Sequence, residues 1–262
     1  MEVRSLHPDK DIYAPKREGE ADLPKYVPYS SAIGALLYLA NATRPDIAFA
    51  VNLLARYTHA PTRRHWNGVK RIFRYLKGTC DMGLFFPKNN QKDLVGFADA
   101  GYLSDPHTAK SQSGYVFLYG GTAISWKSTK QTLTATSSNH AEIIALYEAA
   151  KEAVSLRSIL GHITSNTGRS QHLVNEPTII HEDNAACLAQ MEKRFIKGDR
   201  TKHISPKFFF THELNHKEIE VTKVASDDNV ANIFTKSLPL VKHCKFVPLL
   251  GLRKLSELTK TK

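Results

Sequence analysis

The sequence predicts an α/β fold in which a mixed five-stranded sheet is flanked by helices and preceded by a small helical region. Three observations support this prediction. The pattern of residues 93–128 changes to that of three successive strands. Gly120-Gly121 separates the second strand from the third and is typical of a two-residue hairpin turn. After residue 140, helical and strand-like runs alternate, which indicates crossover connections to two further strands.

The chain divides into four predicted parts. Residues 1–28 are polar, contain four prolines and lack periodicity, so they are predicted as a flexible lead or a strap. Residues 29–90 form the helical region, and residues 91–240 form the sheet domain. Residues 241–262 are predicted as a C-terminal tail.

The helical region contains three predicted helices. Pro45 ends the first helix, because proline disfavours a helical conformation in the residue before it. Asp46 begins the second, where its charge suits the helix dipole. The third begins at Pro61-Thr62 and ends at Gly78.

Two faces distinguish the third helix. Its apolar face is expected to be buried and consists of Trp66, Val69, Phe73 and Leu76. Its basic face consists of Arg63, Lys70, Arg74 and Lys77. A solvated surface is the simplest interpretation of such a face. However, no acidic residue lies between positions 63 and 77, and this self-repulsion favours contact with the phosphates of a polyanion.

Within the sheet domain, the first three strands are predicted at residues 93–100, 114–119 and 122–128. Ser137 and Ser138 precede the next helix and are suited to capping it. The later elements are a helix at 141–160, a strand at 178–181, helices at 184–191 and 207–214, a strand at 218–224 and a helix at 230–235.

Composition narrows the class of protein. The chain has 262 residues and a net charge of +11, with 36 basic against 25 acidic side chains. This surplus favours a nucleic-acid partner, although a generally basic surface is the alternative. Three distant cysteines without a Cys-x-x-Cys pair argue against a zinc ribbon or a disulfide framework. No apolar run has transmembrane length. We expect an intracellular protein, cytoplasmic or nuclear, with no membrane partner and no small-molecule cofactor.

Four short segments carry acidic or near-acidic residues at the ends of different predicted elements. Asp99 ends a strand, Glu142 opens a helix, Asp183 lies between a strand and a helix, and Asn232 lies in the last predicted helix. Carboxylates that converge from such positions repel one another unless a cation neutralises them. Hard oxygen ligands at an open site suit Mg²⁺ or Mn²⁺.

From residue 29 to residue 252 the sequence resembles the C-terminal part of the Pol polyprotein of copia-type retrotransposons. The resemblance rests on several short motifs: residues 43–47 (TRPDI), 75–79 (YLKGT), 124–126 (ISW), 201–204 (TKHI) and 233–236 (IFTK). It implies a thumb and connection region followed by a ribonuclease H domain. The Tyr-x-Asp-Asp signature of the polymerase palm is absent from the sequence, so no polymerase is expected in this chain.

The resemblance implies a catalytic set of Asp99, Glu142, Asp183 and Asn232, of which the three acids are the metal ligands. Asn232 departs from the family, which has an acid there; metal affinity should therefore drop, and Asp227 or Asp228 is the nearby substitute. Two Mg²⁺ or Mn²⁺ ions about 4 Å apart would hold the scissile phosphate. The implied activity is endonucleolytic cleavage of the RNA strand of RNA–DNA hybrids, with the 2′-OH distinguishing RNA from DNA.

Further residues are candidates for nucleic-acid contact. They are Lys127, Lys130, Lys202 and His203, in addition to the basic face of the third helix. A separate reverse-transcriptase polypeptide is a candidate partner beside the hybrid itself. The alternative function is a catalytically weakened or inactive nucleic-acid-binding relic of a polyprotein, because fold alone does not determine activity.

Overall fold

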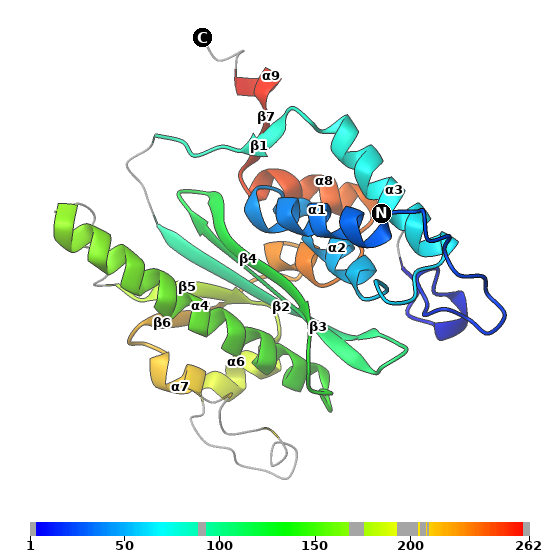
Figure 1. Cartoon of the computed structure of the whole chain (residues 1–262). Helices are drawn as coiled ribbons and strands as arrows, with labels where there is room; N and C mark the ends of the chain where they lie inside the picture. The colour runs from blue at the N-terminus through cyan, green and yellow to red at the C-terminus, as the bar shows by residue number, and fades with distance from the viewer. Residues whose placement is uncertain are drawn as a thin grey trace.

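A five-stranded mixed sheet lies at the centre of the molecule, as predicted (Figure 1). The computed structural model describes residues 4–88, 93–167, 176–192, 204, 208 and 210–258. The strand order is β4-β3-β2-β5-β6. Strands β2, β3 and β4 pair antiparallel, β5 pairs parallel with β2, and β6 pairs parallel with β5. The strands are β2 (Leu94–Asp105), β3 (Lys110–Tyr119), β4 (Thr122–Lys130), β5 (Thr178–Glu182) and β6 (Ile219–Lys223).

The predicted hairpin between β3 and β4 is confirmed. Tyr119 pairs with Thr122, which leaves Gly120 and Gly121 as the two turn residues. Both glycines have positive φ, 58° and 81°, and this backbone conformation is easily reached only without a Cβ atom.

Helices cover both faces of the sheet, because side chains alternate along each strand. On one face, Tyr115 and Phe117 of β3 pack with the long helix α4 (Ser138–Thr167). On the other face, Val116 joins a core formed with the N-terminal helices. Figure 1 shows α4 and the α1–α2 pair on opposite sides of the strands. The smaller helices beside α4 are α6 (Ala185–Glu192) and α7 (Phe210–Leu214).

The helical region packs as one layer against the sheet. It consists of α1 (Tyr29–Ala42), the 3-10 turn η2 (Pro45–Ile47), α2 (Ala48–Ala55) and α3 (Arg63–Gly78). Trp126 of β4 donates its indole N–H to the carbonyl oxygen of Ala40 at 2.7 Å, which fixes α1 on the sheet. The core of this layer contains residues from both sides of the predicted boundary near residue 90.

The buried face of α3 is rotated from the one predicted. It consists of His65, Gly68, Val69 and Ile72, whereas Phe73 is 40% exposed. Gly68 explains the rotation, since a Cβ there would lie 2.8 Å from Tyr13 and 2.9 Å from Leu54. The helix approaches its neighbours most closely along this side, so Phe73 points away from them. Trp66 and Leu76 are partly buried at the margins of the contact.

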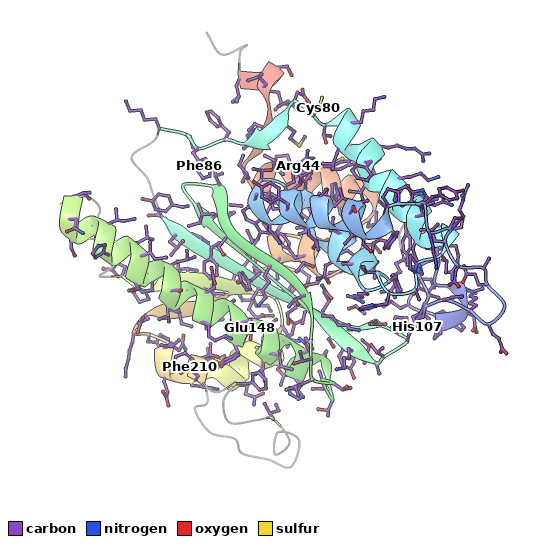
Figure 2. All side chains as sticks on the ribbon, viewed as in Figure 1. Arg44, Cys80, Phe86, His107, Glu148 and Phe210 are labelled. Carbon is purple, nitrogen blue, oxygen red and sulfur yellow. The ribbon has the colours of Figure 1, made fainter. Side chains whose placement is uncertain are left out.

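The N-terminal strap (residues 4–28) packs against the other elements instead of forming a flexible lead. It contains the short 3-10 helix η1 (Pro8–Lys10). Arg4 and Asp11 form a fully buried ion pair of 2.6 Å. Asp11 also lies 2.9 Å from Nε2 of His107 on the β2–β3 hairpin, whose tip lies beside the strap in Figure 2. These contacts hold the strap against the tip of the β2–β3 hairpin.

The segment predicted as a C-terminal tail is also structured. It forms α8 (Leu240–Leu249), β7 (Leu252–Lys254) and α9 (Leu255–Leu258). Strand β7 pairs antiparallel with β1 (Met82–Leu84) in a separate two-stranded sheet. Phe246, Leu250 and Leu252 are buried in the core of the helical layer. Their apolar side chains therefore complete that core.

Candidate metal centre

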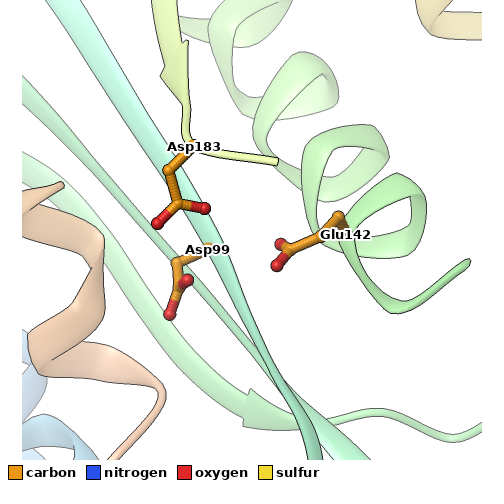
Figure 3. Close-up of side chains that lie close together, drawn as sticks. All are labelled: Asp99, Glu142 and Asp183. Atoms are coloured by element: carbon orange, nitrogen blue, oxygen red, sulfur yellow. The ribbon is translucent and has the colours of Figure 1, made fainter. Parts of the chain in front are cut away.

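Three acidic side chains converge at one end of the central strands. Asp99 comes from the middle of β2, Asp183 follows the last residue of β5, and Glu142 lies in the first turns of α4. One ligand oxygen of each lies within 4.8 Å of the others. Figure 3 shows the three side chains close together. We call Asp99, Glu142 and Asp183 the carboxylate cluster. The sequence predicted that these acids would meet, and the structure brings them together.

Local structure explains how each member reaches the cluster. Val95, Gly96 and Phe97 of β2 pair with Ile179, Ile180 and His181 of β5. This register places Asp99 level with Asp183, which directly follows β5. Ser137 accepts a hydrogen bond from the backbone N–H of His140 at 3.1 Å, which caps the start of α4 as predicted. That helix start carries Glu142 toward the strand ends.

A fourth carboxylate, Glu182, was not predicted from the sequence. Its side chain is fully buried, and Oε1 accepts the backbone N–H of Asn184 at 3.0 Å. This bond shapes the turn that carries Asp183. Glu182 lies two residues after the buried Ile180 and therefore on the same face of β5, and this period-two spacing was the available signal. Its position directly before Asp183 made it resemble an ordinary charged residue at the end of a strand.

Burial and mutual repulsion raise the pKa values of Glu142, Glu182 and Asp99. Burial is the largest cause for Glu142, and the charges of Glu182, Asp99 and Asp183 add to it. Burial also raises the pKa of Glu182 well above its usual range. For Asp99, burial raises the pKa, while Lys236 and Thr235 oppose that effect. A buried group of acids that resists ionisation is a good environment for a neutralising cation.

The cluster fits a hard divalent cation. Oε2 of Glu142 is buried and has no hydrogen-bond partner among the described residues, so it is available as a ligand. All the ligand atoms offered are carboxylate oxygens, which suit Mg²⁺ or Mn²⁺ and provide neither sulfur nor nitrogen for zinc.

Asn232 lies in the 3-10 helix η4 (Val230–Phe234), where the sequence predicted an ordinary helix. Its Nδ2 donates to the carbonyl oxygen of Ser226 at 2.6 Å, and its buried Oδ1 has no hydrogen-bond partner among the described residues. One side of the amide therefore holds the local backbone. The nearby acids do not replace it, because Asp227 and Asp228 are exposed and pair with Lys242 and Lys245.

Two residues after η4 contact the cluster and were also not predicted. Thr235 donates its hydroxyl proton to Oδ2 of Asp99. The Nζ atom of Lys236 lies 3.5 Å from the same oxygen. Neither contact has a periodic signal in the sequence, because both depend on how closely η4 approaches the sheet.

The candidate nucleic-acid residues differ in their surroundings. Arg63, Arg74 and Lys77 of α3 are exposed, and Lys70 is half-buried. Lys127 pairs with Glu148 at 3.3 Å, and Lys130 pairs with Asp105 at 3.2 Å, so both ammonium groups have partners within the protein. Lys202 and His203 lie outside the described residues.

Sequence comparison identifies relatives of the chain. It is 35% identical over 214 residues to the retrovirus-related Pol polyprotein from transposon TNT 1-94 of Nicotiana tabacum, which is 81% of this chain and 15% of that protein. It is 33% identical over 233 residues to the Pol polyprotein from transposon RE2 of Arabidopsis thaliana, again 15% of the relative. The chain is a homologue of the copia- and Ty1-type retrotransposon Pol polyproteins. It spans about 15% of their length.

Other comparisons add three facts about this Pol homologue. Secreted RxLR effector protein 161 of Plasmopara viticola is 45% identical over 130 residues, which are 50% of this chain and 92% of that protein. A structure of LC11-RNase H1 in complex with RNA/DNA hybrid covers 55% of this chain and 94% of its own, with 16% identity and a TM-score of 0.39. No family model matches the chain.

One more solved structure is similar to most of the chain. The foamy viral protease-reverse transcriptase in complex with dsDNA covers 80% of this chain and 40% of its own, with 12% identity and a TM-score of 0.49. Among the described residues, no helix has both the length and the apolar composition that crossing a bilayer requires.

Proposed function

We propose that the chain is a metal-dependent endoribonuclease that cleaves the RNA strand of RNA–DNA hybrids. The observation that carries the proposal is the convergence of three carboxylates, from three separate elements, within 4.8 Å of one another. Isolated surface acids have no reason to meet in a buried, self-repelling group. Divalent cations bound between the carboxylates would neutralise this repulsion and so account for the arrangement.

The residues of the cluster have distinct roles in this proposal. Asp99, Glu142 and Asp183 would hold Mg²⁺ or Mn²⁺, with two ions expected from the resemblance to the family. The bound metal supplies a more acidic attacking water and charge stabilisation at the scissile phosphate. Thr235 holds one oxygen of Asp99, and Glu182 shapes the turn before Asp183, so these two side chains orient the ligands.

The basic face of α3 would bind the phosphates of the same hybrid. Helix α3 packs on α1 and α2, and these helices separate it from the sheet (Figure 1). A hybrid that contacts both regions must therefore extend beyond the cluster. Phe73 is 40% exposed and lies about one helical turn from Lys70 and Lys77, so its ring would offer an apolar contact to the nucleic acid.

The first test is cleavage of an end-labelled hybrid in Mg²⁺ or Mn²⁺. Asp99→Asn keeps the size of the side chain but removes a ligand charge, so it should lower cleavage by at least about a hundredfold while hybrid binding persists. Asp228→Asn is a matched control, because Asp228 is exposed and lies outside the cluster. Double-stranded DNA of the same sequence should remain intact.

Two outcomes would overturn the proposal. Equal cleavage by wild type and Asp99→Asn would show that the site is assigned to the wrong residues. Hybrid binding without cleavage in either metal would favour the alternative function, an inactive nucleic-acid-binding relic.

A further inference from the structure

A lysine reaches the carboxylate cluster from the segment that follows η4. The Nζ atom of Lys236 lies 3.5 Å from Oδ2 of Asp99, whose side chain is 3% exposed. Among the described residues, this is the one ion pair made by a member of the cluster. The Lys236 side chain is itself 47% exposed, so it enters the site from the solvent side.

The position of Lys236 is fixed by tight packing beneath it. A Cβ atom on Gly114 of β3 would lie 2.7 Å from both Phe234 and Thr235, and one on Gly101 would lie 2.7 Å from the carbonyl oxygen of Thr235. Thr235 is fully buried and bonded to Asp99. Two glycines thus allow the backbone immediately before Lys236 to lie directly on the central strands.

An ammonium group at this place changes the electrostatics of the site. It stabilises the ionised form of Asp99 against the burial that opposes ionisation. A divalent ion bound by the cluster would meet the same ammonium as a like charge. The cation that supports the metal-free site is therefore an obstacle to the metal.

We propose that Lys236 is an internal counter-cation of the cluster, which competes with a divalent ion for Asp99 and weakens metal binding in the absence of nucleic acid. Lys236 is a positioning residue in this scheme, because it acts through Asp99. The inference rests on the proposed metal site.

A groove beside Lys236 provides space for its side chain when a metal ion displaces it from Asp99. Lys236 also lines a groove of about 470 Å³ together with Tyr102 and Lys242, beside the cluster. A side chain displaced by metal can lie along this groove. A phosphate at the site would attract both the ammonium and the metal, so the competition should be strongest when no nucleic acid is bound.

The test measures Mn²⁺ binding to the full chain without nucleic acid, by the electron paramagnetic resonance signal of free Mn²⁺. Lys236→Met removes the charge and keeps the length of the side chain. It should lower the dissociation constant for Mn²⁺ roughly tenfold. Lys236→Arg keeps the charge and should retain the wild-type constant. Lys245→Met is a matched control, since Lys245 is 46% exposed and pairs with Asp228 outside the cluster; its constant should stay within about twofold of wild type.

A second readout separates competition from a general structural effect. In EDTA, Lys236→Met should unfold at a lower temperature than wild type, because the carboxylates no longer have their counter-cation. Saturating Mn²⁺ should raise its melting temperature by more than it raises that of wild type. A merely structural lysine would lower stability without tightening metal binding.

The outcomes distinguish this inference from the proposed function. Equal Mn²⁺ affinities in wild type and Lys236→Met, with binding abolished by Asp99→Asn, would overturn the role of Lys236 and leave the metal site intact. If neither protein binds Mn²⁺, or if Asp99→Asn binds it unchanged, the metal site itself is wrong and this inference falls with it.

Discussion

Single residues determine how the carboxylate cluster is positioned on the sheet. Asp99, Glu142 and Asp183 could be identified from sequence because each lies near the end of a predicted element, although β2 continues past Asp99 to Asp105. Glu182 could not be separated from an ordinary charged strand end, and its importance depends on complete burial. Thr235 and Lys236 reach Asp99 only because glycines let η4 approach the strands, which no periodic pattern shows.

The raised pKa of Glu182 leads to a prediction about stability without metal. Burial favours its protonated form in the folded state. That stabilising contribution is fully present below the unfolded pKa of about 4.3 and is lost as pH rises through the folded value. Glu182→Gln cannot ionise and still accepts the N–H of Asn184. In EDTA, the urea midpoint of unfolding of Glu182→Gln should equal that of wild type near pH 4 and exceed it at pH 8.

Glu148 provides a control whose effect on stability should change with pH in the opposite direction. Burial raises the pKa of Glu148, but Lys151 and Lys127 outweigh burial and lower it overall. The charged form of Glu148 therefore stabilises the fold above the unfolded pKa. This contribution is lost as pH falls through the folded pKa. Glu148→Gln should therefore be less stable than wild type at pH 8, and the difference should shrink toward acid. Parallel pH profiles for wild type and Glu182→Gln would contradict the burial argument.

At the scale of elements, most helices and strands were predictable because periodicity and turn residues agree along them. The five strands and α4 follow this rule. The face of α3 was predicted less well, because the packing of Gly68 against Tyr13 and Leu54 determines its rotation. For residues 1–28 the sequence left a flexible lead and a strap as alternatives, and the structure shows the strap. The C-terminal elements were wrongly predicted as a tail, because such short segments carry little periodicity and tertiary contacts order them.

Helix α3 also provides a prediction about binding. Replacing its basic face (Arg63, Lys70, Arg74 and Lys77) by alanine should weaken hybrid binding and flatten its salt dependence. The slope of log affinity against log salt should fall by roughly one unit for each phosphate that is no longer neutralised. The fold should persist, because the helix is anchored by Val69 and Ile72 on its other side. Affinity at several salt concentrations, with circular dichroism for folding, checks both statements.

A charge-matched control keeps the test specific to this face. It replaces four exposed lysines elsewhere, namely Lys10, Lys25, Lys88 and Lys254. That variant has the same reduction in net charge and should keep a slope closer to wild type. If both quadruple variants flatten the slope equally, net charge rather than the α3 face governs binding.

For the whole molecule, a continuous core indicates that the helical layer and the sheet unfold together. Val116 and Phe234 from the sheet side pack in the same cluster as Leu36 and Leu54 from the helices. Trp66 reports on α3, and Trp126 reports on the contact between β4 and α1. Urea transitions of Trp66→Phe and Trp126→Phe should therefore each coincide with their own circular dichroism transition. A fluorescence transition well separated from the helical signal would reveal two independent units.

One hydrogen bond between distant parts of the chain has a consequence for synthesis. The backbone N–H of Arg4 donates to Ser237 at 2.7 Å, across 233 positions of sequence. A chain made from its N-terminus presents the apolar faces of α1 and α2 long before Phe246 and Leu252 leave the ribosome. High contact order of this kind slows folding. The core of the helical layer can therefore be completed only after these C-terminal residues have been synthesised, although α1 and α2 are translated first.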